Sequence, residues 1–499
     1  MSLSIPKVCG IETEYGITMP KTIDANPITA SSMLINAFVN EISGKVGWDF
    51  VDEAPGHDAR GFNLEGSLPP EVETHLVNTV LTNGARFYVD HAHPEYSSPE
   101  CLNPKEAVLY DKAGELVLRK AMAAAKRVLP NEQEIVVYKN NSDRKGNSYG
   151  CHENYIMDRQ VPFNKIARQV TPFFVTRQIF CGSGKVGSEF PNIAKWEVPF
   201  QISQRADFFE EVVGLETTLK RPIVNTRDEP HADATRYRRL HVILGDANMS
   251  QFSSYLKLGT TALVLSMIED SFLDDADLAI EDPVDSLRKV SWDLSLTVPL
   301  RRVSGGSISA LDLQWEFLRL AQKYANQRGT EVLGGDEFGD EIIQGWEETL
   351  QALEADPMSL ADRLDWVAKY QLVLGYMDRH SLEWDDPKLA AIDLQYHDIR
   401  LEKSLFYRLG VRSIWSDEEA EEATHSPPKG TRAYFRGKCL EKYPRNVAAA
   451  NWDSIIFDLG RDPLRRVPMM DPLRGTAKHV DALLERCNTA QELLDALGT

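Results

Sequence analysis

The chain has 499 residues with a formal net charge of −20, and 42% of its residues are hydrophobic while 26% are charged. This length predicts roughly two to three domains, or one large domain with an appendage. The acidic excess disfavours general binding to nucleic acid or to anionic membranes, since either needs a dominant basic surface. A polyanionic ligand would therefore need a local basic groove.

The six cysteines lie far apart and form no C-x-x-C pair, so we expect neither a zinc ribbon nor a disulfide scaffold. Reduced thiols in a cytoplasm fit this pattern best. No apolar run approaches the roughly 18 residues of a membrane span, and the first residues lack the apolar core of a signal peptide. We expect a soluble, cytoplasmic protein with no membrane partner and no nucleic acid partner.

Residues 7–18 (KVCGIETEYGIT) are predicted to form a strand on which Glu12 and Glu14 point the same way. Two adjacent carboxylates are costly unless a cation lies between them or water reaches them. A divalent metal site and an exposed strand face are equally good interpretations of these residues alone. The next segment, 29–41, has its apolar residues at helical spacing.

Residues 42–82 are interrupted by glycine and proline and show no periodic pattern. A run of this length inside a compact domain is commonly a functional lid or a disordered insertion. Its place just before the turn Asn83-Gly84 and the strand that follows favours a lid.

The strand predicted at 86–91 carries a cation, a phenol and a carboxylate on one face. These side chains are Arg86, Tyr88 and Asp90. Pro94 should end regular pairing because it has no N–H, which would place Glu95 and Glu100 on a loop that folds back over that face. Taken alone, the stretch is also typical of an edge strand with a solvated polar face.

Two later predicted strands, 151–158 and 239–244, repeat the pattern. His152 and Asn154 share one face of the first, and Arg239 and His241 share one face of the second. A single histidine on a strand is more often hydrogen-bonded than a metal ligand. The recurrence of polar residues at period two on four separate strands nevertheless indicates a shared site.

A locally basic region lies between these two strands. Its members are Arg205, Lys220, Arg221, Arg227, His231, Arg236 and Arg238. Some of these charges are typical of an ordinary helix surface, but arginines that bind phosphates or carboxylates bidentately would come from such a region. The sequence has no phosphate-binding glycine loop, so metal ions and arginines would have to hold a nucleotide's phosphates.

Oxygen and imidazole ligands suit Mg²⁺ or Mn²⁺, which keep bound waters and bridge phosphate oxygens. Five side chains on an antiparallel platform could build such a site. They are Glu12, Tyr88, Glu95, His152 and His241.

The remainder of the chain is predicted to be mainly helical. Helical periodicity marks residues 103–128, 254–269, 311–326, 341–353, 359–377 and 476–497. The acidic stretch 416–422, followed by Ser426-Pro427-Pro428, is typical of a linker. We therefore place a catalytic domain at 1–425, with a mobile loop insertion at about 42–81, and a small C-terminal domain at 426–499.

Four segments resemble the Pup ligase and Pup deamidase/depupylase family, whose members are relatives of glutamine synthetase. They are GIETEYGI from Gly10, NGARFYVDHAHPEYSSPEC from Asn83, GCHENY from Gly150 and RLHVILGDANMS from Arg239. The resemblance covers nearly the whole chain. It implies an α+β fold, in which a glutamine-synthetase-like antiparallel sheet platform packs with helices and carries a small C-terminal domain. It also implies ATP and Mg²⁺ as cofactors, Pup and pupylated proteins as partners, and we favour a monomer.

The family has two branches. One joins the C-terminal glutamate of the small protein Pup to a substrate lysine with ATP, and the other deamidates Pup's C-terminal glutamine and cleaves the isopeptide bond. The insertion at 42–81, which contains Asp58-Ala59-Arg60-Gly61-Phe62, and the wording VDHAHPEYSSPEC resemble the second branch. GIETEYG suits both branches equally. We therefore expect an amidohydrolase.

Matching motifs carry the family's site residues onto this chain. The resemblance implies that Mg²⁺ is held by the five side chains named above, and that ATP is contacted by Arg86, Ser97, Ser98, Asn154 and Arg239, with Trp452 packing on the nucleotide. Asp90 would be the catalytic residue, either attacking to give an anhydride or activating water. Arg205 or Arg227, with the metal ions, would stabilise the oxyanion. The family suggests that ATP, or ADP with phosphate, acts as a bound cofactor that is not consumed in each turnover.

Two alternatives remain open at this point. The first is the ATP-consuming ligase, and the second is a catalytically silent regulator that binds nucleotide.

Overall fold

The computed structural model describes residues 4–20, 22, 25–42, 46–51, 53–63, 77–130, 133–194 and 196–498. Within these residues the largest sheet has ten strands, in the order β13-β8-β1-β6-β5-β4-β3-β16-β17-β18. They are β1 (Cys9–Glu14), β3 (Gly47–Trp48), β4 (Asn78–Val80), β5 (Arg86–Asp90), β6 (His93–Ser97), β8 (Cys151–Asp158), β13 (Tyr237–Val242), β16 (Val447–Ala450), β17 (Ser454–Phe457) and β18 (Arg465–Pro468). Neighbours along this order are antiparallel, apart from the parallel pair β3 and β16.

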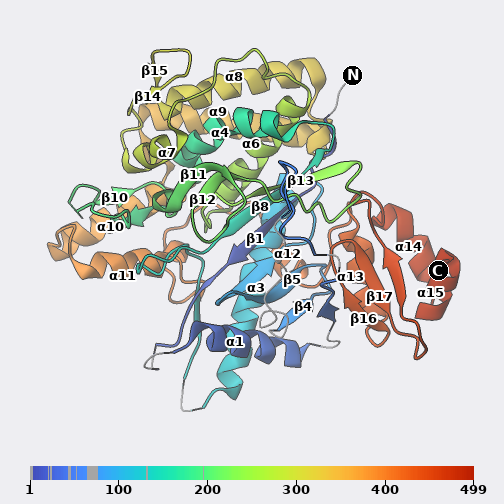
Figure 1. Ribbon diagram of the computed structural model, residues 1–499. Coiled ribbons are helices and arrows are strands. Elements are labelled where there is room, and N and C mark those ends of the chain that lie inside the picture. The colour runs from blue at the N-terminus through green and yellow to red at the C-terminus, as the bar shows by residue number, and fades with distance from the viewer. Residues whose placement is uncertain are drawn as a thin grey trace.

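Helices α1 (Pro27–Glu41) and α3 (Pro104–Val128) cover one face of the central strands, as Figure 1 shows. Phe87, Val89 and Tyr96 alternate along β5 and β6 and belong to the same apolar cluster as residues of both helices. Asparagine caps begin both helices, at Asn26 and Asn103. Because side chains alternate along a strand, the polar residues of these strands project from the other face.

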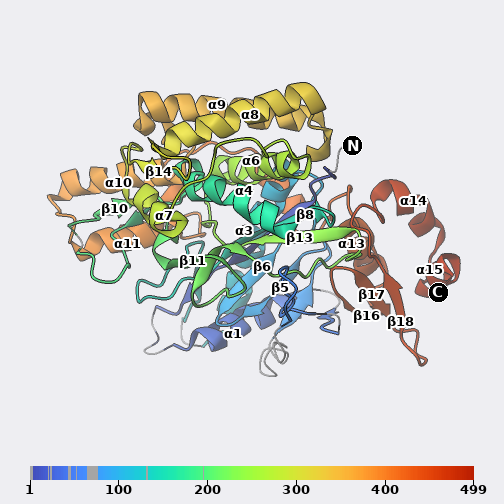
Figure 2. The ribbon, with the colours of Figure 1, turned by 45° about the horizontal axis from the view of Figure 1, so that its top comes forward.

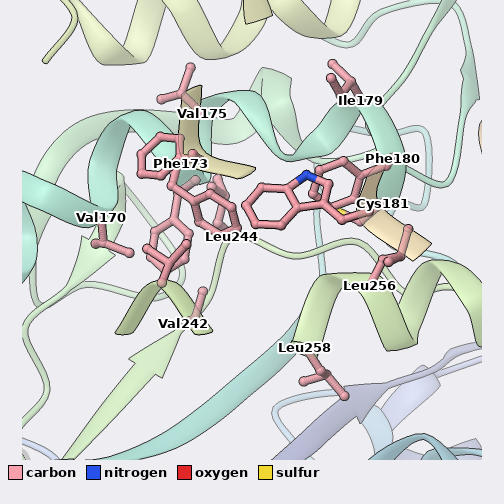
Figure 3. Close-up of a cluster of buried hydrophobic side chains, with 14 of the residues drawn as sticks. Val170, Phe173, Val175, Ile179, Phe180, Cys181, Val242, Leu244, Leu256 and Leu258 are labelled. Atoms are coloured by element: carbon pink, nitrogen blue, oxygen red, sulfur yellow. The ribbon is translucent and has the colours of Figure 1, made fainter. Parts of the chain in front are cut away.

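A second layer consists of helices that lie beyond the β8 and β13 side of the sheet (Figure 2). Its members are α4 (Phe163–Thr176), α5 (Gln178–Cys181), α6 (Gln251–Glu269), α7 (Pro283–Trp292), α8 (Ala310–Arg328), α9 (Asp336–Ala355), α10 (Asp365–His380) and α11 (Pro387–Tyr396). Figure 3 shows the apolar side chains of α4, α5 and α6 meeting those of β13, including Phe173, Phe180, Leu256 and Val242. This contact anchors the edge strand β13 to the helices.

Shorter elements complete the described chain. Four small sheets pair β2 (Gly16–Thr18) with β7 (Val136–Tyr138), β9 (Lys185–Val186) with β10 (Phe200–Gln201), β11 (Phe209–Gly214) with β12 (Arg221–Asn225), and β14 (Leu300–Arg301) with β15 (Ser307–Ile308), counted within the described residues. Short 3-10 helices lie at Ala206–Phe208, Glu331–Leu333, Pro357–Leu360 and Phe406–Arg408.

The C-terminal residues continue the main sheet. β16, β17 and β18 join it through β3, and α13 (Ala433–Lys442), α14 (Ala477–Arg486) and α15 (Ala490–Leu497) pack around them. Glu100, just after β6, accepts hydrogen bonds from Arg432 and Arg436, which ties this unit to the central strands.

The α+β fold with an antiparallel platform and packed helices is confirmed, and several local expectations are corrected. Residues 7–18 form two strands in different sheets, β1 and β2, which Tyr15 separates. Pro94 lies inside β6, where its carbonyl accepts the N–H of Tyr15 at 3.0 Å, so Glu95 lies on a strand and not on a loop.

The stretch predicted as a linker contains a helix, α12 (Asp417–Glu422). A capping box between Ser416 and Glu419 begins it, and it packs on α3, where Lys120 and Glu421 form an ion pair at 2.5 Å. The acidic residues of this stretch therefore lie in the first turn of a helix and help to cap its N-terminus.

The insertion predicted at 42–81 is partly ordinary sheet. Residues 47–48 and 78–80 are β3 and β4, and Asp58 pairs with Arg227 in an isolated bridge. Residues 43–45, 52 and 64–76 of the predicted lid lie outside the described residues. Along the stretches that the structure describes, no helix has the length and apolar character needed to cross a bilayer.

Glu100 offers a test of how the C-terminal unit is held. Burial raises the pKa of Glu100, but Arg436 and Arg432 lower it by more than burial raises it. The pKa therefore falls from the ordinary 4.5 to about 2. Because the pKa is lower in the folded state, the ion pairs stabilise the fold fully above pH 4.5 and lose this effect as the pH falls through about 2. We expect Glu100→Gln to lower the free energy of unfolding by about 3 kcal/mol near neutral pH, measured by urea unfolding.

The matched control is Glu441→Gln, which removes an exposed carboxylate from α13. Its effect should stay within about 0.5 kcal/mol. An equal loss from both variants, or a loss from Glu100→Gln that does not shrink at about pH 3, would contradict this role.

Candidate active site

A cavity of about 810 Å³ lies over the open face of the central strands. Its floor is the polar face of β1, β5, β6, β8 and β13, and its walls include Gly146–Gly150, the residues around Arg205 and Arg221, and Trp452 of the C-terminal unit. The four strand motifs expected to converge therefore do so.

Strand register decides which polar residues meet. Glu12 of β1 lies opposite both Ser97 of β6 and His152 of β8, while Glu14 lies opposite Glu95. Directly opposed residues of antiparallel strands point to the same face with their Cβ atoms about 5 Å apart. Residues far apart in the sequence are therefore brought within bonding reach of shared ligands.

The first cluster that could hold a cation consists of Glu12, His152 and His241, whose ligand atoms all lie within 4.8 Å of one another. Burial, then the charge of Arg239, lowers the pKa of His241 well below its ordinary value, so its imidazole is neutral. Its Nδ1 lies 2.9 Å from Asn154 Oδ1, an acceptor, so Nδ1 carries the proton and Nε2 keeps a lone pair. A neutral imidazole and a carboxylate are suitable ligands for a divalent metal.

Asn154 connects this cluster, although the sequence suggested it only as a nucleotide contact. Its Oδ1 accepts hydrogen bonds from His241 and from Arg239 Nη1 (2.8 Å), while its Nδ2 donates to Glu12 Oε1 at 2.9 Å. One amide therefore orients two candidate ligands and one cation, as groups around metal ligands commonly do.

The second cluster consists of Glu14, Asp90 and Glu95, with ligand atoms again within 4.8 Å of one another. Burial raises the pKa of Glu95 well above its ordinary value, and the charges of Asp90, Glu12 and Glu14 raise it further. Such repulsion is what a divalent cation would relieve, so the donor set fits Mg²⁺.

Two residues of this second cluster bear on the sequence predictions. Tyr88, predicted as a metal ligand, donates its hydroxyl hydrogen to Glu95 Oε1 at 2.5 Å. The predicted set of metal ligands did not include Glu14. Its position two residues after Glu12, on the same face of the strand, was the sequence signal that could have identified it.

Asp90 is the last residue of β5, at the start of a tight turn. His91 there has φ of 49°, and its Nδ1 lies 2.9 Å from Asp90 Oδ2. Burial raises the pKa of Asp90, but His91 and Arg86 lower it, and the net direction is downward. Asp90 is therefore a carboxylate at neutral pH, as a nucleophile or a general base must be.

Arg86 lies between two aromatic rings, with its guanidinium 4.0 Å from the Trp48 ring centroid and 3.9 Å from that of Tyr88. Its Nε donates to Asn78 Oδ1 at 3.0 Å, and its Nη1 lies 3.7 Å from the Glu53 carboxylate. Cation–π contacts thus fix this arginine in the cavity wall.

A narrow apolar slot of about 80 Å³ continues from the cavity. Both spaces share Glu12, Ser97, His231, Arg239 and Trp452. The slot's other linings include Ile11, Ile156, Pro230 and Pro472. A mainly apolar space that is lined also by cations and carboxylates can hold an aromatic base with its charged groups outside.

The residues predicted to contact the nucleotide each line at least one of these two spaces, but they form different hydrogen bonds. Ser97 Oγ donates to Glu95 at 3.2 Å, whereas Ser98 Oγ accepts from the Ile11 N–H at 2.9 Å and donates to the Pro99 carbonyl at 3.2 Å. The Ser98 hydroxyl therefore links the backbone of β1 to the residues that follow β6.

The two arginines predicted to bind substrate or phosphate lie in different charge environments. The charge of Arg227 acts on His241 and Arg239, on the Glu12 side, whereas the charges that act on Arg205 include those of Arg221, Glu14 and Asp246. Sequence reasoning could not separate them because both come from loops of the same basic region.

Two residues at the mouth of the slot were not predicted as site residues. Glu229 accepts the Ala54 N–H at 2.6 Å and faces Arg239, and half-buried His231, with φ of 47°, lines both spaces. Neither lies on a strand, so no periodic pattern marked them.

A family model described as Pup-ligase protein matches residues 7–456. The chain belongs to the Pup-ligase protein family. Among named members of this family, the depupylase of Acidothermus cellulolyticus is 53% identical, over 98% of this chain and 99% of that protein. The Pup deamidase/depupylase of Mycolicibacterium smegmatis is 47% identical over the same shares. The resemblance stated from the four sequence segments is thereby confirmed.

Solved structures from the family share this fold. The complex between Pup and its ligase PafA aligns with a TM-score of 0.81 at 32% identity, covering 97% of this chain and 92% of the ligase. PafA in complex with ADP aligns with a TM-score of 0.74 at 35% identity, covering 83% and 91%.

Asn154 provides a test of the first cluster. We expect Asn154→Ala to weaken Mn²⁺ binding by about 10- to 100-fold, because Glu12 and His241 lose the amide that orients them. Isothermal titration with Mn²⁺ would measure this. Asn488→Ala, an exposed change on the C-terminal unit, is the control. Unchanged affinity in Asn154→Ala would mean that the amide does not position the ligands.

Proposed function

We propose that this chain hydrolyses the C-terminal glutamine of Pup to glutamate and cleaves the isopeptide bond between Pup and substrate lysines. The names of the relatives at 53% and 47% identity support this activity. The observation that carries the proposal is the position of Asp90, which clusters with Glu14 and Glu95 at the floor of a large polar cavity.

Two divalent ions suit the two clusters. Glu12, His152 and His241 would hold one Mg²⁺, and Glu14, Asp90 and Glu95, with Tyr88 beside them, would hold a second. Bound Mg²⁺ supplies positive charge for anionic oxygens. The chain's own part is to keep His241 neutral through burial and the charge of Arg239, to orient its ring through Asn154, and to hold Glu95 in place through the Tyr88 hydroxyl.

ATP would bind with its base in the slot and its phosphates toward the cavity. Trp452 and Pro230 supply apolar walls for the base, and Arg239, Arg86 and Arg227 supply the cations. The ADP complex of a family member at 35% identity supports nucleotide binding at this fold.

Amide hydrolysis requires a nucleophile, stabilisation of the oxyanion and a proton for the leaving amine. Asp90 would either attack the side-chain carbonyl, giving an anhydride that water opens, or remove a proton from attacking water. His91, at 2.9 Å, orients the Asp90 carboxylate. Arg205 lies in the cavity wall, where the charge of Glu14 acts on it, and it could supply positive charge to the oxyanion.

Asp90→Asn tests the catalytic assignment. We expect retained ADP binding and a loss of glutamine-to-glutamate conversion of about 10²- to 10⁴-fold, because the amide can neither attack nor accept a proton. Mass spectrometry of Pup incubated with protein, ATP and Mg²⁺ gives the readout. Near-normal turnover would refute the role.

The same assay distinguishes the hydrolase from a ligase. A Pup–protein ligase of Kineococcus radiotolerans is 40% identical over 82% of this chain, which keeps that activity as the second candidate. A lysine adduct of Pup with release of ADP would establish ligation, and bound ATP with no change in Pup would indicate a silent regulator.

Glu14→Gln tests the second cluster. We expect the number of bound Mn²⁺ ions to fall from two to one, since the substitution removes a charged ligand from one cluster only. Electron paramagnetic resonance of Mn²⁺ titrated into the protein would count them. Glu210→Gln, on the cavity wall but outside both clusters, should leave the count at two.

A further inference from the structure

His93 begins β6, in the pairing position directly opposite Asp90 at the end of β5. Directly opposed residues of antiparallel strands point to the same face, with their Cβ atoms about 5 Å apart. Both residues line the main cavity. His93 was not predicted as a site residue, yet the register of this hairpin places its imidazole beside the candidate catalytic carboxylate.

Contacts on two sides fix the His93 ring. Its Nδ1 lies 3.0 Å from the Tyr15 carbonyl oxygen, and because a carbonyl can only accept, Nδ1 carries a proton. The ring stacks on Tyr149, with the two centroids 4.2 Å apart and an angle of 28° between the planes. Tyr149 is itself held by the hydrogen bond from its hydroxyl to Asn140 Oδ1 at 2.7 Å. In the neutral imidazole the acceptor lone pair is therefore at Nε2.

Nε2 of His93 has no hydrogen-bond partner among the residues that the structure describes, and it is not one of the fully buried atoms left without a partner. It is therefore accessible from the cavity that His93 lines. The neighbouring imidazoles differ, because His91 Nδ1 lies 2.9 Å from Asp90 and because His152 and His241 belong to the first cation cluster. His93 thus offers the cavity a neutral acceptor in a fixed orientation.

A side-chain amide that enters the cavity brings two polar groups. Its carbonyl oxygen takes positive charge from the cations of the site, and its N–H needs an acceptor, because a buried donor without one weakens binding. Glu14 and Glu95 lie in the second cation cluster with Asp90, so a bound cation would occupy these carboxylates. His93 Nε2 belongs to neither cluster and lies on the residue opposite Asp90. It is therefore suited to the N–H of the amide on which Asp90 acts.

We propose that His93 Nε2 accepts a hydrogen bond from the N–H of the amide that is cut, and so positions the leaving nitrogen beside Asp90. This inference rests on the proposed function. Hydrolysis forms a C–O bond from water and breaks the C–N bond, and the nitrogen takes up the proton that water gives. As the C–N bond loses its double-bond character, a nitrogen held through its N–H keeps a fixed orientation toward that proton.

The same contact suits both substrates of the proposed reaction. A terminal glutamine and a terminal glutamate linked to lysine each have an N–H that points away from the carbonyl oxygen, so one acceptor serves both while the cations face the oxygen. The glutamate that is released has a carboxylate oxygen in place of this N–H, and its lone pairs would face the lone pair of Nε2. The contact therefore favours the uncut amide over the product.

The test compares Pup that ends in glutamine with Pup that ends in the γ-methyl ester of glutamate, which lacks the N–H. We expect His93→Asn to lower kcat/KM for the amide by about 10- to 100-fold, because the new side chain can still donate to the Tyr15 carbonyl but leaves no acceptor at the place of Nε2. The value for the ester should stay within about twofold, since a loss that depends on the N–H is the coupling expected of a direct contact. Mass spectrometry measures both conversions.

Further variants separate this contact from a structural effect. His93→Gln places a carbonyl oxygen near the position of Nε2 and gives up the bond to Tyr15, so it should keep more of the amide rate than His93→Asn, whereas a purely structural role through Tyr15 predicts the reverse order. The matched control is His380→Asn, because His380 is an exposed histidine of α10 that also stacks on a tyrosine, Tyr376. It should leave both rates unchanged.

Thermal unfolding of each variant checks that it is folded. If His93→Asn does not fold, His93→Phe, which keeps a stacked ring without nitrogen atoms, takes its place with the same expectation. The proposal is overturned if the variant lowers the amide and ester rates equally, if it leaves the amide rate unchanged, or if His93→Gln loses more of the amide rate than His93→Asn.

Failure of the proposed function has a separate signature, which is a wild-type protein that converts neither form of Pup. Equilibrium binding of the two forms, measured by calorimetry, then decides the contact by itself. A larger loss of affinity for the glutamine form than for the ester form in His93→Asn supports the hydrogen bond, and an equal effect on both forms refutes it.

Discussion

Antiparallel register is the constraint on which the site depends. β1 lies between β6 and β8, and the pairing sets Glu12 opposite Ser97 and His152 while Glu14 meets Glu95. A slip of one residue would turn all of these side chains into the apolar layer of α1 and α3. The helices on that side, and their contacts with Phe87 and Tyr96, therefore protect the chemistry on the other side.

The cost of gathering carboxylates on one face explains the surrounding charges. Burial and the charges of Asp90, Glu12 and Glu14 raise the pKa of Glu95, whereas the contact with His152 and the charge of Arg239 help to keep Glu12 ionised. Arginines then lie at both ends of the cavity, Arg239 and Arg227 toward the slot and Arg205 and Arg221 toward Glu14. A locally cationic groove can thus exist in a chain of net charge −20.

The C-terminal unit also helps to form the site. β3 pairs with both β4 and β16, so Trp48 is placed where it packs on Arg86 and, edge to face, on Trp452. Glu100, held by Arg432 and Arg436, fixes the other side of the junction. The wall of the slot that Trp452 provides therefore depends on contacts between residues more than three hundred positions apart.

The sequence by itself determined the alternation of side chains along each strand. It placed Arg86, Tyr88 and Asp90 on one face, paired His152 with Asn154 and Arg239 with His241, and gave helices such as 103–128 whose periodicity is local. The family motifs, confirmed by the relatives, supplied the remaining expectations of fold and activity.

Only the tertiary structure decided which of these faces meet. It moved Glu14 into a cluster with Asp90, kept Pro94 inside a strand and separated Arg227 from Arg205. It also placed Arg221 near Arg205, where both arginines donate hydrogen bonds to Ser148. Periodicity fixes the direction of a side chain relative to its own strand, whereas register and long-range packing, which bring distant segments together, fix its neighbours.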